Sequence, residues 1–157
     1  MRKVLLTVVL VVTGACSSAS KSAPPRGAAL PAASGSANST GSASAKAAVE
    51  TFLAAVKAQD LQAMSMIWGT EAGLAREQMS RDELEKRLVI MQCNLNHDSW
   101  SYAMGVDGTT RSGEEDLRIE LRQKNLKEQT IVTAVRGKNG RWFVKNIDLS
   151  KLNQFCR

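Results

Sequence analysis

The side chains with the clearest acid–base chemistry lie close together, within residues 97–107. His97 is the only histidine; imidazole titrates near neutral pH, and the carboxylate of Asp98 is positioned in sequence to orient it. Adjacent residues usually point apart, so we expect His97 to be a solvated turn residue. Tyr102 and Asp107 are a second acid–base candidate, but an odd spacing on a regular strand places them on opposite faces. We therefore expect no enzymatic activity.

The three cysteines offer thiol chemistry, and the first of them, Cys16, follows an apolar segment. Arg2 and Lys3 precede nine apolar or small residues at positions 4–12, which is the pattern of a signal peptide. Nine helical residues cover less than half of the ~30 Å hydrocarbon core of a bilayer. We therefore do not expect this segment to remain as a membrane-spanning helix.

The stretch VTGAC at residues 12–16 resembles the lipobox of bacterial lipoproteins. The resemblance implies that residues 1–15 are a signal peptide, that Cys16 becomes the first residue, and that its thiol and amine carry acyl chains. Lipoboxes usually have leucine where this chain has Thr13. Each buried CH₂ contributes ~0.8 kcal/mol, so three chains would give a stable membrane anchor. The alternative is ordinary secretion after cleavage behind Ala15.

The residue after the lipidated cysteine sorts lipoproteins between membranes, and here it is Ser17. The resemblance implies a lipid-anchored protein of the cell envelope, on the outer membrane and facing the periplasm in a cell with two membranes. Residues 16–44 are dominated by Ala, Ser, Gly and Pro, which bury too little surface to fold. We interpret them as a lipidated, disordered tether with a coil span of roughly 30 Å.

The net charge of +6 does not belong to the folded part of the chain. Four basic residues precede residue 45, and the other 17 stand against all 15 acidic residues, which leaves about +2. Acidic and basic residues alternate within this region rather than forming a basic stripe. We therefore expect no nucleic-acid partner.

Three helices are predicted in the first half of the domain. Apolar spacing of three and four residues predicts a helix that begins after Ser44, a second that begins after Asp60, and a third that begins with the capping box Ser80 to Glu83. The residues expected on their buried faces are Val49, Phe52, Leu53, Val56, Leu61, Met64, Ile67, Trp68, Leu84, Leu88, Met91 and Leu95.

Beyond His97 the apolar residues recur at every second position, which predicts strands. Alternation runs over residues 100–106 and 117–122, and two further strands, 131–136 and 141–149, flank the hairpin signal Gly137-Lys138-Asn139-Gly140. The sequence therefore predicts about four antiparallel strands.

Helices followed by strands make a segregated α+β fold, and this order resembles the nuclear transport factor 2-like superfamily. The likeness rests on AAVETFLAAVKAQDLQAMSMIW at residues 47–68 and RWFVKNIDL at 141–149, and it covers residues 45–157. It implies three N-terminal helices packed on a curved, cone-shaped sheet. Members of the superfamily include small isomerases, dehydratases and hydrolases as well as proteins that bind without chemistry, so the fold alone does not choose a function.

Two cysteines, Cys93 and Cys156, remain if Cys16 is lipidated, and an even pair outside the cytosol predicts a disulfide. The bridge would close a loop of about 63 residues and contribute roughly 4 kcal/mol. The alternatives are two independent buried thiols or a metal site. One histidine and no CxxC spacing speak against a metal, so we expect no metal and no cofactor.

The candidates for the lining of a pocket are four aromatic residues, Trp68, Trp100, Tyr102 and Trp142. Packing in the core is the commoner role of such side chains. We expect the domain to bind a small apolar ligand or a protein partner in the envelope. The alternatives are a small acid–base enzyme that uses the same cone and a structural protein that dimerises through its sheet.

Overall fold

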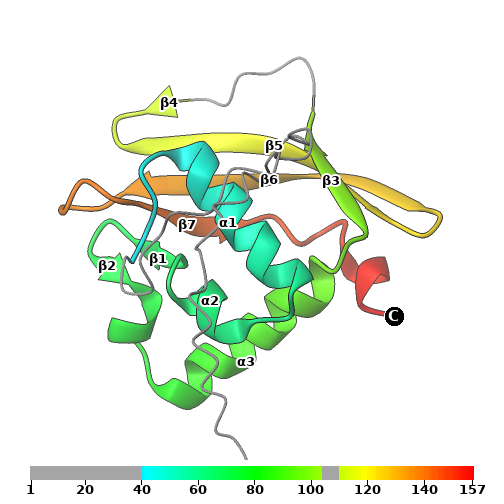
Figure 1. The fold of residues 1–157 in the computed structure, drawn as a ribbon, viewed down its shortest axis with the longest axis horizontal. Helices are drawn as coiled ribbons and strands as arrows, with labels where there is room; N and C mark the ends of the chain where they lie inside the picture. The colour runs from blue at the N-terminus through cyan, green and yellow to red at the C-terminus, as the bar shows by residue number, and fades with distance from the viewer. Residues whose placement is uncertain (1–39, 104–109) are drawn as a thin grey trace, which may run out of the picture. The chain divides into compact units, whose positions relative to one another are not determined.

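The structure, a computed structural model, describes residues 40–103 and 110–157. Its main sheet is antiparallel, with strand order β3-β5-β6-β7, and α1, α2 and α3 lie on one side of it (Figure 1). The predicted α+β arrangement, helices packed against an antiparallel sheet of about four strands, is confirmed. The elements are α1 (Ala45–Lys57), α2 (Leu61–Ser65), β1 (Gly69–Thr70), β2 (Gly73–Leu74), η1 (Ala75–Glu77), α3 (Arg81–Asn94), β3 (Ser99–Tyr102), β4 (Thr110–Arg111), β5 (Glu114–Gln123), β6 (Leu126–Arg136), β7 (Trp142–Ile147) and η2 (Asn153–Cys156).

The predicted residues cap the helices. Ser44 Oγ accepts a hydrogen bond from the Ala47 amide at 3.2 Å, and Asp60 Oδ1 accepts one from the Ala63 amide at 2.9 Å. Each bond satisfies an amide that has no partner within the helix. At α3 the Ser80 hydroxyl accepts from the Glu83 amide, but the Glu83 side chain pairs with Arg87 instead of returning to Ser80, so only half of the predicted capping box forms.

The second helix is shorter than predicted. It ends at Ser65, whereas the apolar spacing had extended it to Trp68. The backbone beyond it joins the sheet, because the Val144 amide donates to the Ile67 carbonyl at 3.0 Å and Trp68 forms a parallel bridge with Val144. The chain thus leaves α2 through a hydrogen-bonded turn, in which the Trp68 amide donates to the Met64 carbonyl at 3.0 Å, and then pairs with β7.

The sheet buries one face of β5. Leu117, Ile119 and Leu121 belong to the same buried cluster as the side chains of α1, while the alternate residues Arg118 and Arg122 are exposed. β5 pairs with β6 over ten residues, and a two-residue turn at 124–125, in which Lys124 has φ +52°, joins them. The predicted hairpin at residues 137–140 is also present, closed by the Gly137 amide on the Arg141 carbonyl at 2.8 Å.

The predicted tether extends too far. Residues 16–39 lie outside the described residues, but Gly41 and Ser42 are buried. Ser42 exchanges two backbone hydrogen bonds with Trp142, at 2.8 and 2.9 Å, and the Arg141 guanidinium donates to the Gly41 carbonyl at 2.7 Å. A polar, small-residue composition hides this pairing, because the contacts are made by the backbone.

Candidate functional site

Two of the four aromatic candidates, Trp100 and Tyr102, form a pair on β3. Their ring centroids are 5.1 Å apart in an edge-to-face arrangement. The Tyr102 hydroxyl donates to the Lys46 carbonyl at 3.3 Å and lies 3.5 Å from a Glu50 carboxylate oxygen on α1. Burial, followed by the negative charge of Glu50, raises the pKa of Tyr102 above the ordinary value for a phenol.

The other two aromatic residues, Trp68 and Trp142, lie at the opposite edge of the sheet. Trp142 belongs to β7 and pairs with Ser42, and Trp68 bridges Val144 of the same strand. β5 and β6 separate β3 from β7. The register places Tyr102 level with Thr130 of β6 but Trp142 opposite Arg136, so the two pairs are separated along the strands as well as across them. The four side chains are half-buried against one core and do not converge on one another.

Side chains fill the space between the helices and the sheet. The largest fully buried ones, each less than 2% exposed, come from the helices, the sheet and the C-terminal segment. They are Phe52, Phe143, Phe155, Leu53, Met64, Leu95, Ile119, Leu121, Leu152, Val49, Val56 and Val132. The described part of the interior is thus a packed core, the usual state of protein interiors.

The expectation of a solvated His97 is wrong, because the side chain is only 4% exposed. Its Nδ1 lies 2.8 Å from the Leu95 carbonyl oxygen, and its Nε2 is buried with no hydrogen-bond partner within residues 40–103 and 110–157. Desolvation by burial is the largest effect on the imidazole and lowers its pKa. The polar composition of this turn predicts a solvent-exposed side chain, but packing of the surrounding elements covers the imidazole ring.

His97 and Asp98 do not form an acid–base pair. The Asp98 carboxylate accepts the Lys124 amide at 2.7 Å, while the Lys57 ammonium donates to the Asp98 carbonyl at the same distance. The imidazole is turned to Leu95 instead. Asp107, the other predicted partner of an acid–base pair, lies outside the described residues.

Cys93 and Cys156 form the predicted disulfide. Their Cα atoms are 4.8 Å apart, which lies within the normal range for a disulfide. The bond joins the last turn of α3 to η2, where Leu152 and Phe155 are buried on either side of the C-terminal turn.

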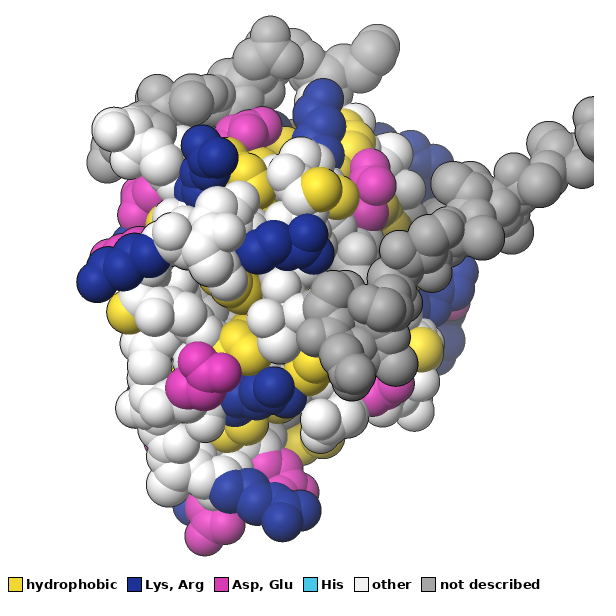
Figure 2. All heavy atoms as spheres, turned by 60° about the vertical axis from the view of Figure 1, so that its left-hand side comes forward, with side chains coloured by type: hydrophobic (Ala, Val, Ile, Leu, Met, Phe, Trp, Pro, Cys, Tyr) yellow, Lys and Arg dark blue, Asp and Glu magenta, His cyan; other side chains and the backbone are white. Residues whose placement is uncertain are grey.

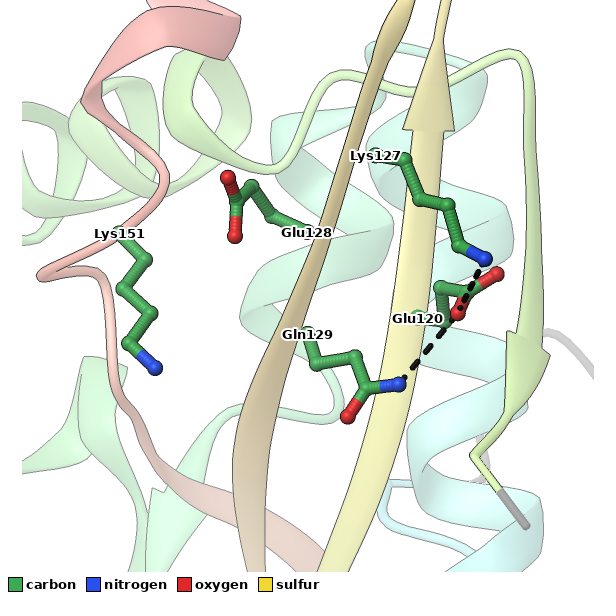
Figure 3. A pocket seen from close by; sticks show the side chains of 5 residues that line it. All are labelled: Glu120, Lys127, Glu128, Gln129 and Lys151. Atoms are coloured by element: carbon green, nitrogen blue, oxygen red, sulfur yellow. Dashed lines mark hydrogen bonds and ion pairs between the residues drawn. The ribbon is translucent and has the colours of Figure 1, made fainter.

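A hollow of about 310 Å³ lies along β6, where residues 127–129 extend beyond the end of β7 (Figure 3). The Glu120 carboxylate at its floor accepts two hydrogen bonds from Arg122, at 2.7 and 3.0 Å, and one from Gln129 at 3.4 Å, and Lys127 lies 3.2 Å away. These donors, Arg122 first, lower the pKa of Glu120. A carboxylate that is already saturated with donors is a structural group and not a free base.

Two further hollows border α3. The first, of about 220 Å³, lies between α2 and α3 and is lined by Leu61, Gln62, Ser65, Arg81, Leu84, Glu85 and Leu88. The second, of about 480 Å³, is mostly apolar and lies on the outer face of α3, where Val89 is 45% and Ile90 55% exposed. Asp82, Glu85 and Lys86 surround these two side chains. None of the four aromatic candidates lines these three hollows.

Charged side chains of both signs are interspersed on the face drawn in Figure 2, and apolar side chains lie between them. Within residues 40–103 and 110–157, no group of three or more His, Cys, Asp or Glu side chains is placed to hold a metal ion. No helix in the described part of the chain is long and apolar enough to cross a membrane.

No protein-family model matches the sequence, no curated protein matches it, and no solved structure matches it. Its function is therefore inferred from its own residues.

Proposed function

We propose that the protein is a bacterial envelope lipoprotein, anchored through acyl chains on Cys16, whose folded domain binds a protein partner. The signal-peptide pattern of residues 1–15 and the resemblance of residues 12–16 to a lipobox support the anchor. The Cys93–Cys156 disulfide supports an oxidising compartment, because such bonds are rare in the cytosol. In a cell with two membranes, the protein would be attached to the outer membrane and face the periplasm.

We further propose that the domain has a nuclear transport factor 2-like fold, with three helices on the concave side of a cone-shaped sheet. The order of helices and strands and the placement of all helices on one side of the sheet support this assignment. The fold carries no function by itself, because the same architecture serves enzymes and binding proteins.

A protein partner is favoured over a small apolar ligand by one observation: the described interior is filled, and the exposed large apolar side chains lie outside, on α3. Exposed apolar surface with a charged rim is typical of contact sites. We therefore assign the partner to the outer hollow of α3, which Val89 and Ile90 form together with Asp82, Glu85 and Lys86. An enzymatic role is disfavoured by the separate hydrogen-bond partners of His97 and Asp98.

Replacing Cys16 by serine is expected to abolish incorporation of an alkyne-tagged palmitate and to lower the membrane-bound share of the protein at least about tenfold, because the acyl chains supply the attachment. Labelled cells are fractionated and the membranes washed with carbonate. Ser18→Ala, which keeps the cysteine, is the matched control and should behave like the wild type. A wild-type protein that takes up no label would contradict the proposal and favour secretion after cleavage behind Ala15.

Replacing Ile90 by glutamate is expected to reduce partner binding by about tenfold or more, because the contact would then bury a charged carboxylate in place of an apolar side chain. Cross-linking in intact cells, followed by isolation of the protein from solubilised membranes, measures the yield of the cross-linked complex. Ala54→Glu adds the same charge at an exposed position of α1 and should leave the yield unchanged. Equal yields from both variants, with both folded by circular dichroism, would exclude α3 as the contact surface.

A further inference from the structure

The one histidine of the chain lies in a setting that suits only its neutral form. The Leu95 carbonyl is an acceptor, so Nδ1, at 2.8 Å from it, carries the ring proton. Nε2 then presents a lone pair, and none of the described residues forms a hydrogen bond with it, although His97 is only 4% exposed. A second proton at Nε2 would have no acceptor.

The turn that holds His97 is fastened to two neighbouring parts of the fold through Asp98. The Lys57 ammonium at the end of α1 donates to the Asp98 carbonyl at 2.7 Å. On the other side, the Asp98 amide donates to the Arg122 carbonyl of β5 at 2.8 Å, and the Asp98 carboxylate accepts the Lys124 amide at 2.7 Å. At Asp98, the turn that follows α3 is therefore tied to α1 by one hydrogen bond and to the β5–β6 hairpin by two.

The charged groups that act on the imidazole are Lys57 and Asp98. Burial lowers the pKa of His97, and the positive charge of Lys57 lowers it further, against the hydrogen bond to Leu95 and the charge of Asp98, which raise it. Since the Asp98 carboxylate is held by the Lys124 amide, it is not free to turn and pair with an imidazolium.

We propose that the turn Leu95–Asp98 is a pH-sensitive latch with a closed state, in which Asp98 keeps its hydrogen bonds, and an open state, in which these bonds are broken. Uptake of a proton from solvent at His97 Nε2 places a second, unpaired positive charge beside Lys57. This charge favours the open state, in which Asp98 has released α1 and the β5–β6 hairpin. The disulfide at Cys93 keeps α3 attached to the C-terminal segment, so the opening is local. This property goes beyond partner binding and does not depend on it.

The direction of the pH dependence follows from the two states of the turn. In the closed turn the pKa of His97 is below its ordinary value of 6.5, and in the open turn it returns to that value. The open state thus binds more protons, so the closed state is fully stable above about pH 6.5 and loses stability as the pH falls below it.

The experiment uses the full-length protein in detergent micelles, purified without a polyhistidine tag. Because His97 is the only histidine, ¹⁵N-labelled histidine reports its tautomer and pKa without assignment. Amide hydrogen exchange, corrected for the intrinsic effect of pH, gives the protection of the Asp98 and Lys124 amides. We expect an Nδ1–H tautomer, an imidazole pKa below 6.5, and protection that falls about threefold or more between pH 7.5 and pH 5.

The variant His97→Gln is neutral at every pH and should retain equal protection at pH 7.5 and pH 5. A variant that loses protection at low pH as the wild type does would overturn the proposal, since another group would then be responsible. If this variant does not fold, the imidazole pKa and the amide protection of the wild type test the proposal by themselves. An imidazole that titrates at or above 6.5, or that titrates while both amides stay protected, also overturns the latch.

Discussion

Replacing Cys93 and Cys156 together by serine is expected to lower the free energy of unfolding by about 4 kcal/mol. The disulfide closes a chain segment with a sequence separation of 63 residues, and such a loop restricts the unfolded chain strongly. In the folded state the bond holds η2 against the end of α3, while Leu152 and Phe155 bury their side chains in the main core. An effect of this size is a large fraction of the stability of a single domain.

Urea denaturation followed by circular dichroism measures this change, with the Cys16→Ser protein as the soluble background for both forms. Cys16→Ser alone retains the bond and serves as the control, so any loss belongs to the pair. Because the C-terminal segment is short, its amides should exchange faster in the double variant before the rest of the domain opens. Equal urea midpoints with equal slopes would mean that the bond contributes little, and that burial of Phe155 suffices to hold the segment.

The sequence predicts best those features in which a side chain forms its hydrogen bond with a backbone group only a few residues away. Ser44, Asp60 and Ser80 each cap a helix through an amide three residues ahead. The buried face of α3 is predicted for the same reason: Leu88, Met91 and the C-cap residue Leu95 recur at helical spacing and are buried, whereas Leu84 is only partly buried. Such patterns depend on the local geometry of the chain and not on contacts with distant segments.

The long β5–β6 ladder was predicted only in part. The sequence predicts strands at 117–122 and 131–136, but the paired strands reach Gln123 and resume at Leu126, so only the turn at 124–125 separates them. The segment 123–130 is mostly polar, because β6 extends beyond β7 there and one of its edges is open. Its strand conformation comes from pairing with β5, which no periodicity within the segment reveals.

The setting of His97 could not be read from the sequence either. Asparagines and Asp98 surround it, and such residues usually mark a solvated turn. The turn is held by residues far away in the chain, such as Lys57, which donates a hydrogen bond to the Asp98 carbonyl across 41 positions. In contrast, Val89 and Ile90 carried a usable signal, since both are apolar and neither belongs to the buried spacing of α3.

The aromatic candidates illustrate a related limit of sequence analysis. Alternation along a strand indicates which residues share a face, and Trp100 and Tyr102 do share one. It does not indicate the order of strands in the sheet, which places Trp142 on the opposite edge. A pocket lined by residues of several strands depends on that order.

Replacing Phe52 by alanine is expected to lower the free energy of unfolding by about 3 to 5 kcal/mol. The ring is 1% exposed and lies on the buried face of α1, which contacts β6 and β7. Its removal forfeits the transfer free energy of the ring and leaves a cavity that rigid neighbours cannot fill completely. Val89→Ala shortens an exposed side chain and should change stability by no more than about 0.5 kcal/mol.

The same pair of variants distinguishes a packed domain from a ligand chamber, because an apolar cavity of this origin stays dry and binds small apolar molecules. Benzene should therefore raise the melting temperature of Phe52→Ala and leave those of the wild type and Val89→Ala unchanged, as monitored by circular dichroism. Binding of benzene by the wild-type domain would mean that its interior already holds an apolar chamber. The small-ligand alternative would then be preferred to a partner bound at α3, since the filled interior is the observation on which that choice depends.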